Sequence, residues 1–192
     1  MTEPTLLIVT GPPAAGKTTL ARRLAIDLSL PLFSKDAIKE SLFDTLGTGD
    51  RAWSMKLGVA SIELLFHTLA WQLGAGNSVI AETAFIPEYD NARFLDLQRM
   101  HPCSLMQIYV TASPAILAKR FKDRANSGDR HSGHVDTRLD ENEYLVSLRA
   151  GKYAKLDLNT SIIQMDTTEA GMVDYSRLLE VARGCLATPK LT

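Results

Sequence analysis

A glycine-rich stretch near the N-terminus, Gly11-Pro12-Pro13-Ala14-Ala15-Gly16-Lys17-Thr18, matches the phosphate-binding pattern G-x-x-x-x-G-K-[ST]. The residues before it, 5–10 (TLLIVT), form a short apolar run that is typical of a buried parallel strand. Residues 19–29 after it mix leucine, isoleucine and alanine with charged side chains, as an amphipathic helix does. A strand, a glycine-rich turn and a helix in this order predict a P-loop, which binds the phosphates of a nucleotide.

Each position of this loop has a physical role in such a site. Gly11 and Gly16 allow the backbone to turn its N–H groups toward phosphate oxygens, and the following helix adds the partial positive charge of its N-terminus. Lys17 can reach the outer phosphates, and the hydroxyl of Thr18 suits Mg²⁺. We therefore expect ATP and Mg²⁺ as the cofactors. The expected nucleotide ligands of this segment are Gly11, Pro12, Pro13, Ala14, Ala15, Gly16, Lys17, Thr18 and Thr19.

The composition is that of an ordinary globular protein. The chain has 192 residues, of which 45% are hydrophobic and 22% charged, and its formal net charge is −1. This balance gives no overall attraction to nucleic acid or to an anionic membrane. Two cysteines provide no disulfide framework, and the first four residues do not resemble a signal peptide. No apolar run has the length of a membrane span, so we expect a cytoplasmic protein without a membrane partner.

Strand-like and helix-like segments alternate along the rest of the chain. Further strands are expected at 30–34, 78–81, 105–110 and 161–165, and further helices at 37–43, 51–73, 87–100, from 113 onward, at 139–149 and at 173–185. This alternation predicts an α/β fold with a five-stranded parallel sheet sandwiched by helices. We expect a P-loop NTPase similar to nucleoside and nucleotide kinases. It would form a single domain over 1–192 with a mobile lid at about 120–135.

Two carboxylates follow predicted strands and should lie at the same edge of the sheet as the P-loop. Asp36 follows the second strand and is a candidate catalytic residue, although an aspartate there could also be the N-cap of the next helix. Glu82 follows the third strand and could hold the water shell of the metal or orient the acceptor. Thr18 and Glu82 are therefore the candidate metal ligands.

Cations gather in the segment predicted to be the lid. Its helix carries Arg120 and Arg124, and the glycine-containing stretch after it carries Arg130. Beside a P-loop, such a segment can bring positive charge to the transferred phosphoryl group; the alternative is a solvated basic helix face. His131 and His134 are disfavoured as metal ligands because no cysteine or third ligand lies nearby in the sequence.

The segment 51–73 is strongly apolar and should be mostly buried or line a pocket. We interpret Trp53 as a core aromatic residue rather than a substrate contact. His67 has apolar neighbours and no second ligand nearby, so we expect it to be a packed histidine.

Four motifs together resemble the small P-loop kinases related to polynucleotide kinase, chloramphenicol phosphotransferase and zeta toxins. They are GPPAAGKT at 11–18, Asp36-x-x-Lys39, Glu82-Thr83 and Arg120-x-x-x-Arg124. The resemblance implies that Asp36 accepts the proton of the acceptor hydroxyl and that Lys39, where the family often has arginine, contacts the phosphates. It also implies that Arg120, Arg124 and Arg130 close on ATP. The catalytic set that follows is Lys17, Asp36, Lys39, Arg120 and Arg124.

The expected function is transfer of the γ-phosphoryl group of ATP to a hydroxyl of a small molecule. The alternatives are a polynucleotide 5′-hydroxyl kinase and a non-catalytic nucleotide-binding adaptor. A GTPase is disfavoured: D-x-x-G occurs at 44–47, where it should end a helix, but the guanine-binding N-K-x-D is absent. A nucleotide kinase would need an arginine cluster, whereas 36–53 contains only Arg51.

Residues 38–66 are expected to shape the acceptor pocket. From 36 to 73 the chain has three cations against five carboxylates, which disfavours a nucleic acid strand and favours a compact, partly apolar acceptor.

Overall fold

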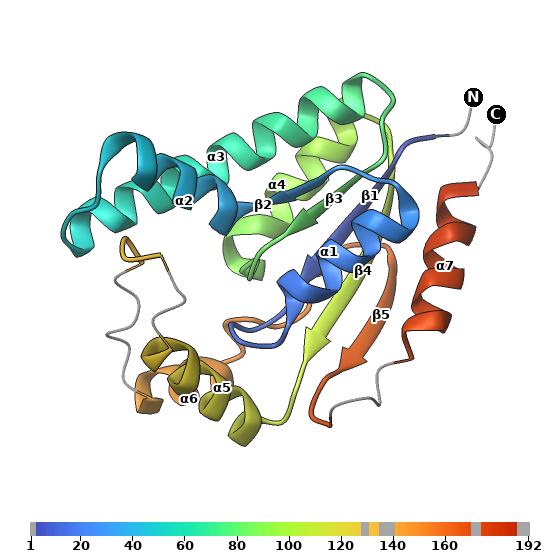
Figure 1. Ribbon diagram of the computed structural model, residues 1–192. Coiled ribbons are helices and arrows are strands. Elements are labelled where there is room, and N and C mark those ends of the chain that lie inside the picture. Colours follow the sequence, from blue (N-terminus) through green and yellow to red (C-terminus); the bar gives the residue numbers. More distant parts are fainter. Residues whose placement is uncertain (1–2, 128–130, 135–140, 170–173, 188–192) are drawn as a thin grey trace.

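The structure is a computed structural model that describes residues 3–127, 131–134, 141–169 and 174–187. In this part of the chain five parallel strands form one sheet in the order β2-β3-β1-β4-β5, with helices on both faces (Figure 1). The predicted fold class is confirmed. The strands are β1 (Thr5–Thr10), β2 (Leu32–Ser34), β3 (Val79–Glu82), β4 (Ser104–Thr111) and β5 (Ser161–Asp166). The helices are α1 (Lys17–Leu28), α2 (Lys35–Leu46), α3 (Arg51–Gly74), α4 (Pro87–Met100), α5 (Pro114–Asn126), α6 (Glu141–Arg149) and α7 (Tyr175–Ala187).

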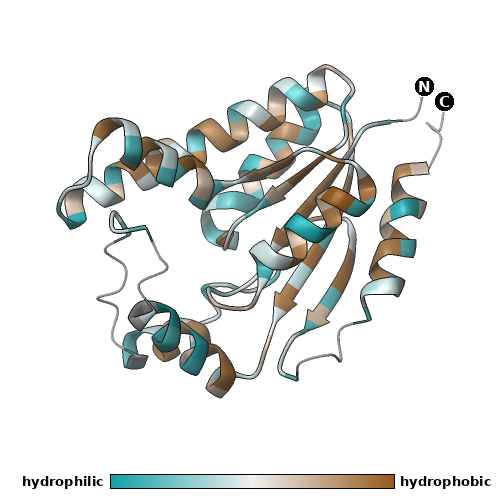
Figure 2. Cartoon of the chain, viewed as in Figure 1, coloured by the Kyte–Doolittle hydropathy of each residue, from teal (hydrophilic) through white to brown (hydrophobic). Residues whose placement is uncertain are grey.

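The core has two layers because successive side chains of a strand point to opposite faces of the sheet. In the central strand β1, Leu7 and Val9 belong to the apolar cluster that includes residues of α1, α5 and α7. Leu6 and Ile8 belong to the cluster on the other face, formed with α3 and α4. All four side chains are fully buried. The strands are correspondingly apolar, whereas the outer faces of the helices are mixed (Figure 2).

The P-loop follows β1, the central strand, and the remaining strands lie on both sides of it. From β1 the chain passes to β2 and back to β3 on one side, and then to β4 and β5 on the other. In open α/β sheets, ligands bind at the carboxyl ends of the strands at such a point. The residues that follow β1, β2 and β3 are therefore brought to one edge.

Two glycines allow the tight path of the P-loop. Gly11 has a φ of 135°, and a Cβ there would lie 1.9 Å from the carbonyl oxygen of Val110 in β4. Gly16 has a φ of 89° and is the N-cap residue of α1. The helix consequently begins at Lys17, two residues earlier than expected, so Lys17 and Thr18 lie in its first turn.

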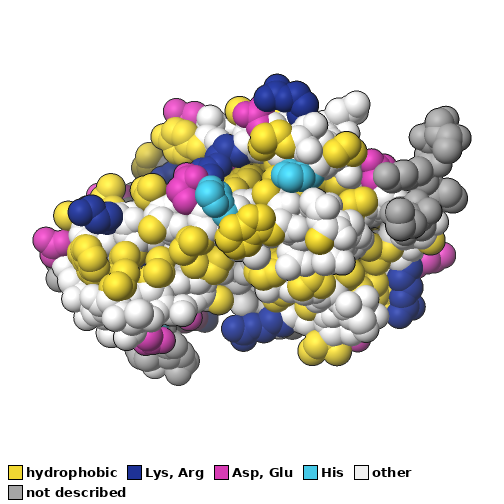
Figure 3. Space-filling model, turned by 90° about the horizontal axis from the view of Figure 1, so that it is seen from above, with side chains coloured by type: hydrophobic (Ala, Val, Ile, Leu, Met, Phe, Trp, Pro, Cys, Tyr) yellow, Lys and Arg dark blue, Asp and Glu magenta, His cyan; other side chains and the backbone are white. Residues whose placement is uncertain are grey.

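Helix α3 has a narrow buried stripe at the helical spacing. Its members are Ser54, Leu57, Ser61, Leu65, Phe66, Leu69 and Leu73. The prediction for His67 was wrong: its side chain is exposed, because position 67 lies off this stripe, and its ring contacts the edge of Trp71 at a centroid distance of 6.3 Å. Figure 3, a view onto this side of the molecule, shows histidine and hydrophobic side chains at the surface. Among the helices of the described ranges, none combines the length and apolarity required to cross a membrane.

The prediction of a core position for Trp53 was also wrong. Trp53 is half-buried, and its indole N–H donates to the carbonyl oxygen of Gly47 at 2.9 Å. Its backbone N–H donates to the carboxylate of Asp50, the N-cap of α3, at 2.8 Å. The indole therefore covers the loop that joins α2 to α3, where an indole can keep its polar N–H satisfied.

Candidate active site

Glu82 joins three elements at the carboxyl edge of the sheet. Its carboxylate accepts hydrogen bonds from the hydroxyl of Ser34 at the end of β2, at 2.7 Å, and from the hydroxyl of Thr18 in α1, at 3.3 Å. The strand register explains the first contact, because Ser34 pairs with Glu82 across β2 and β3. Glu82 is only 4% exposed, and burial raises the pKa of its carboxyl group.

The donor set around Glu82 fits the expected Mg²⁺. A threonine hydroxyl and a carboxylate are hard oxygen ligands, and Mg²⁺ is usually held by one or two such protein groups together with phosphate oxygens and water. The contact between Thr18 and Glu82 brings both oxygen donors to one point beside the P-loop.

Lys17 is buried inside the loop. Its ammonium donates to the carbonyl oxygen of Pro12 at 2.8 Å. Burial lowers the pKa of Lys17 to about 8; the charges of Glu82 and Asp36 oppose this shift, and that of Arg124 adds to it. The charges of Glu82, Asp36 and Arg124 therefore all act on Lys17, although Arg124 lies 107 positions away in the sequence.

Asp36 lies in the first turn of α2 and is half-buried. The alternative interpretation of Asp36 as an N-cap is wrong, because Ser34 occupies the cap position. A carboxylate in the first turn of a helix still benefits from the partial positive charge of the helix N-terminus. The side chain is close enough to Lys17 to act on its pKa, as a catalytic carboxylate beside the phosphates would be.

Lys39 lies at the interface of α2 with α3. Its ammonium donates to the hydroxyl of Ser54 at 3.0 Å and lies 5.3 Å from the ring centroid of Phe43. The hydroxyl of Ser54 donates in turn to the carbonyl oxygen of Gly133 at 3.1 Å. Lys39 also lines the neighbouring cavity.

The predicted lid arginines differ in their surroundings. Arg120 donates to the hydroxyl of Thr167 at 2.9 Å and to its carbonyl oxygen at 2.7 Å, and that hydroxyl lies 3.1 Å from the carbonyl oxygen of Ala15. Arg120 thus holds the turn after β5 against the P-loop. Arg124, one helical turn later in α5, lies near Lys17. Arg130 lies outside the described residues.

Residues 131–134 (HSGH), which we call the 131–134 segment, contact α2. His131 pairs with the carboxylate of Asp44 at 3.0 Å, and His134 with that of Glu40 at 2.9 Å. Both rings contact Phe43, His131 in a stacked arrangement at a centroid distance of 5.4 Å. Each histidine therefore has one acidic partner on α2. Within the described ranges, no three histidine, cysteine or acidic side chains cluster as a metal site.

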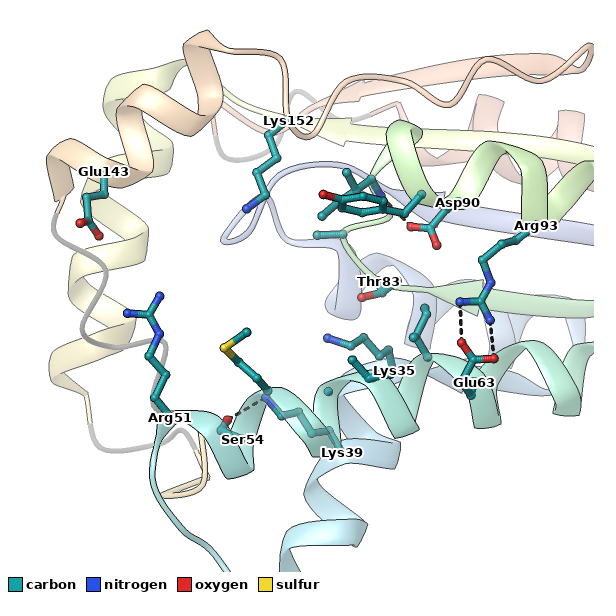
Figure 4. Close-up of a pocket in the computed structure, with 17 residues that line it drawn as sticks. Lys35, Lys39, Arg51, Ser54, Glu63, Thr83, Asp90, Arg93, Glu143 and Lys152 are labelled. Carbon is teal, nitrogen blue, oxygen red and sulfur yellow. Dashed lines mark hydrogen bonds and ion pairs between the residues drawn. The ribbon is translucent and has the colours of Figure 1, made fainter.

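A cavity of about 630 Å³ opens next to these groups (Figure 4). Residues 38–66 were expected to shape it, and α3 does supply Met55, Val59 and Ile62. Other walls come from outside residues 38–66: Thr83, Ala84, Ile86, Tyr89, Asp90, Arg93, Glu143 and Lys152. Two of the lining residues are sequence neighbours of the candidate carboxylates: Lys35 precedes Asp36, and Thr83 follows Glu82.

Tyr144 is a contributor to the site that the sequence analysis missed. Its hydroxyl donates to the carbonyl oxygen of Pro13 in the P-loop at 2.5 Å, and its ring stacks on Phe121 at a centroid distance of 4.4 Å. Burial raises the pKa of Tyr144, so the phenol remains a hydrogen-bond donor. This contact spans 131 sequence positions, and no local pattern points to it.

Fold and site together define a P-loop protein with a kinase-like architecture. The P-loop follows the central strand β1, and Glu82 of the neighbouring strand β3 contacts its Thr18. The basic helix α5 lies near the loop, since Arg124 acts on Lys17. The chain belongs to the AAA domain family, whose profile matches residues 6–144.

Solved structures agree with this assignment. A protein described as a putative kinase from Chloroflexus aurantiacus J-10-fl is 39% identical; the match covers 96% of this chain and 100% of that chain, with a TM-score of 0.88. A gluconokinase from Sinorhizobium meliloti 1021 is 13% identical, with coverages of 97% and 94% and a TM-score of 0.51. Shikimate kinase from Bacteroides thetaiotaomicron is 19% identical, with coverages of 94% and 98% and a TM-score of 0.51. The last two share the fold alone. Curated proteins gave no match.

Proposed function

We propose that the protein is an ATP-dependent kinase that transfers the γ-phosphoryl group to a hydroxyl of a small molecule. The observation that carries this proposal is the position of Asp36. Its negative charge acts on the pKa of Lys17 in the P-loop, and the residue before it lines a cavity large enough for a small molecule. A sequence identity of 39% to a protein described as a putative kinase, over 96% of this chain and 100% of that chain, supports the same class.

In the proposed reaction, Asp36 accepts the proton of the acceptor hydroxyl as its oxygen bonds to the γ-phosphorus. The bond from that phosphorus to the bridging oxygen breaks, and ADP leaves. Lys17 and Arg124 stabilise the charge on the phosphoryl oxygens. Thr18 and Glu82 would hold Mg²⁺, which supplies further charge neutralisation when it is bound.

A turnover screen tests the proposal. Purified protein is incubated with ATP and Mg²⁺ and with hydroxyl compounds, nucleosides and 5′-hydroxyl oligonucleotides, and ADP release is measured with and without each acceptor. We expect acceptor-dependent release with a small molecule. Nucleotide binding without turnover would favour the adaptor, and efficient oligonucleotide phosphorylation that falls steeply with salt would favour the polynucleotide kinase.

Asp36→Asn tests the mechanism. Asparagine has the same size but cannot accept the proton, so we expect ATP affinity near that of the wild type and turnover lower by roughly 10²-fold or more. Asp96→Asn is the matched control, because Asp96 forms an exposed ion pair with Arg99 in α4. Unchanged turnover in folded Asp36→Asn would remove Asp36 from the mechanism.

A further inference from the structure

The cavity beside Asp36 has a different charge from the sequence segment that was expected to form it. Five cations line it, because Lys35, Arg93 and Lys152, which lie outside residues 36–73, join Lys39 and Arg51. Three carboxylates line it as well, those of Glu63, Asp90 and Glu143. The net negative charge of residues 36–73 therefore does not describe this cavity.

The charged lining groups of Arg93, Glu63 and Asp90 already have an ion-pair or hydrogen-bond partner. Arg93 forms two contacts of 2.9 Å with Glu63, one from each terminal nitrogen to each carboxylate oxygen. The carboxylate of Asp90 accepts a hydrogen bond from the backbone N–H of Ile86 at 2.7 Å, and burial raises its pKa. With the Arg93–Glu63 pair set aside, four cations face two carboxylates, an excess of two positive charges.

Arg51, Lys152 and Lys35 point into one space from different walls. Figure 4 shows Arg51 on α3 and Lys152 after α6 reaching into the opening from opposite sides, with Lys35 projecting toward it from the start of α2. Across residues 3–127, 131–134, 141–169 and 174–187, none of these three cations has a carboxylate within ion-pair distance. Three converging cations are suited to an anionic group of a ligand.

The same cavity has an apolar side that limits the size of the ligand. Met55, Val59 and Ile62 of α3 line it together with Ile86 and Tyr89. A volume of about 630 Å³ is in the range of small-molecule sites. The ligand that matches both features is compact and has an anionic end.

We propose that the acceptor carries a carboxylate or phosphate in addition to the hydroxyl that is phosphorylated, and that Arg51, Lys152 and Lys35 hold this anion. The inference rests on the proposed kinase function insofar as it treats the ligand as the acceptor, but binding of an anion at this site requires no catalysis. It narrows the compact, partly apolar acceptor expected from the sequence segment to a hydroxy acid or a phosphorylated alcohol.

Binding to protein saturated with MgADP tests the site, because the nucleotide prevents anions from occupying the P-loop. The probes are matched pairs of equal carbon skeleton, such as glycerate with glycerol, gluconate with sorbitol, and glycerol 3-phosphate with glycerol, together with acetate and a 5′-hydroxyl oligonucleotide. Calorimetry and the thermal shift are measured at low salt. We expect at least one anionic probe to bind at least 10-fold more tightly than its neutral partner. The carboxylate and phosphate arms identify which anion is preferred.

Arg51→Gln and Lys152→Gln should each weaken the binding of that probe about 10- to 100-fold, the effect of removing one charge-assisted hydrogen bond. Lys56→Gln is the control, because Lys56 is an exposed cation of α3 outside the cavity lining, and it should leave binding unchanged. Equal binding of charged and neutral partners throughout the panel, or anion binding that survives both substitutions, would overturn the proposal. So would preferential binding of the oligonucleotide. Anion binding without any phosphorylation would leave the site in place and count against the kinase function alone.

Discussion

Lys17 is a buried cation of the P-loop. In the nucleotide-free protein its pKa is lowered to about 8 by burial, whereas in the unfolded chain it is about 10.5. Between these values the unfolded chain binds more protons than the folded protein, so this group makes stability rise with pH. Below pH 8 both states are protonated, and the folded protein bears the full cost of the buried charge.

Lys17→Met should therefore stabilise the nucleotide-free protein at pH 7, by up to about 3 kcal/mol. The advantage of the variant over the wild type should shrink as the pH rises from 8 to 10.5. Urea unfolding of both proteins at pH 7 and pH 10 measures it. A difference that does not change with pH would contradict the burial of this charge.

Tyr144 is the residue through which α6 contacts the P-loop. Tyr144→Phe removes the hydrogen bond to the Pro13 carbonyl but keeps the stack on Phe121. We expect a loss of about 1 kcal/mol in the free energy of unfolding. We also expect weaker nucleotide binding, because one carbonyl of the loop is no longer held in place.

Tyr109→Phe is the control for Tyr144→Phe. The hydroxyl of Tyr109 donates to the carbonyl oxygen of Tyr153 at 3.0 Å, which is a similar hydrogen bond outside the P-loop. This variant should lose comparable stability and keep the nucleotide affinity of the wild type. Equal affinities in both variants would mean that Tyr144 does not organise the loop.

Helix α2 carries the catalytic candidate at its start and holds the 131–134 segment near its end. Phe43 is the centre of this second contact. It is 2% exposed, contacts both histidine rings, and lies so close to Gly133 that a Cβ there would be 2.4 Å from its ring. The segment therefore packs on α2 through one aromatic ring and two flanking acid–histidine pairs.

Phe43→Ala should free the 131–134 segment and destabilise the protein by about 3 kcal/mol, as is usual for truncation of a buried phenylalanine. The backbone N–H groups of Gly133 and His134 donate to His131, at 3.1 and 3.0 Å, so their hydrogen exchange reports on the segment. We expect faster exchange there than in the wild type. Leu46→Ala, at an exposed position of the same helix, should leave the exchange unchanged; faster exchange in both variants would argue against a specific role of Phe43.

The protein as a whole assembles its nucleotide site from β1 with its loop, the start of α2, the end of β3, and α5. We expect a bound ATP analogue with Mg²⁺ to hold these elements together and to close the proposed lid at 120–135. Limited trypsin digestion should then slow more at Arg120 and Arg124 than at Arg183 in α7, which lies outside the site. Equal slowing at all three would indicate general stabilisation by ligand binding, about 2.7 kcal/mol at a 100-fold excess over Kd, without a lid.

The sequence alone determined the features that depend on a few neighbouring residues. The P-loop is one of them, because its glycines, lysine and threonine act within eight positions, and the strand before it and the helix after it have periodicities of their own. The alternation of strands and helices was likewise sufficient for the parallel sheet. That topology in turn brought Asp36 and Glu82 to the P-loop edge, since the carboxyl ends of parallel strands meet there.

Only the tertiary structure decided what depends on contacts between distant segments. The exposure of His67 follows from which face of α3 packs on the sheet, and apolar neighbours in the sequence do not determine this. Arg120 contacts the turn after β5, and Tyr144 contacts the P-loop, each across more than 40 positions. The charge of the cavity also arises in this way, because Lys35, Arg93 and Lys152 lie far apart in the sequence. Electrostatic interactions act through space, so a charge count along the chain cannot replace the three-dimensional arrangement.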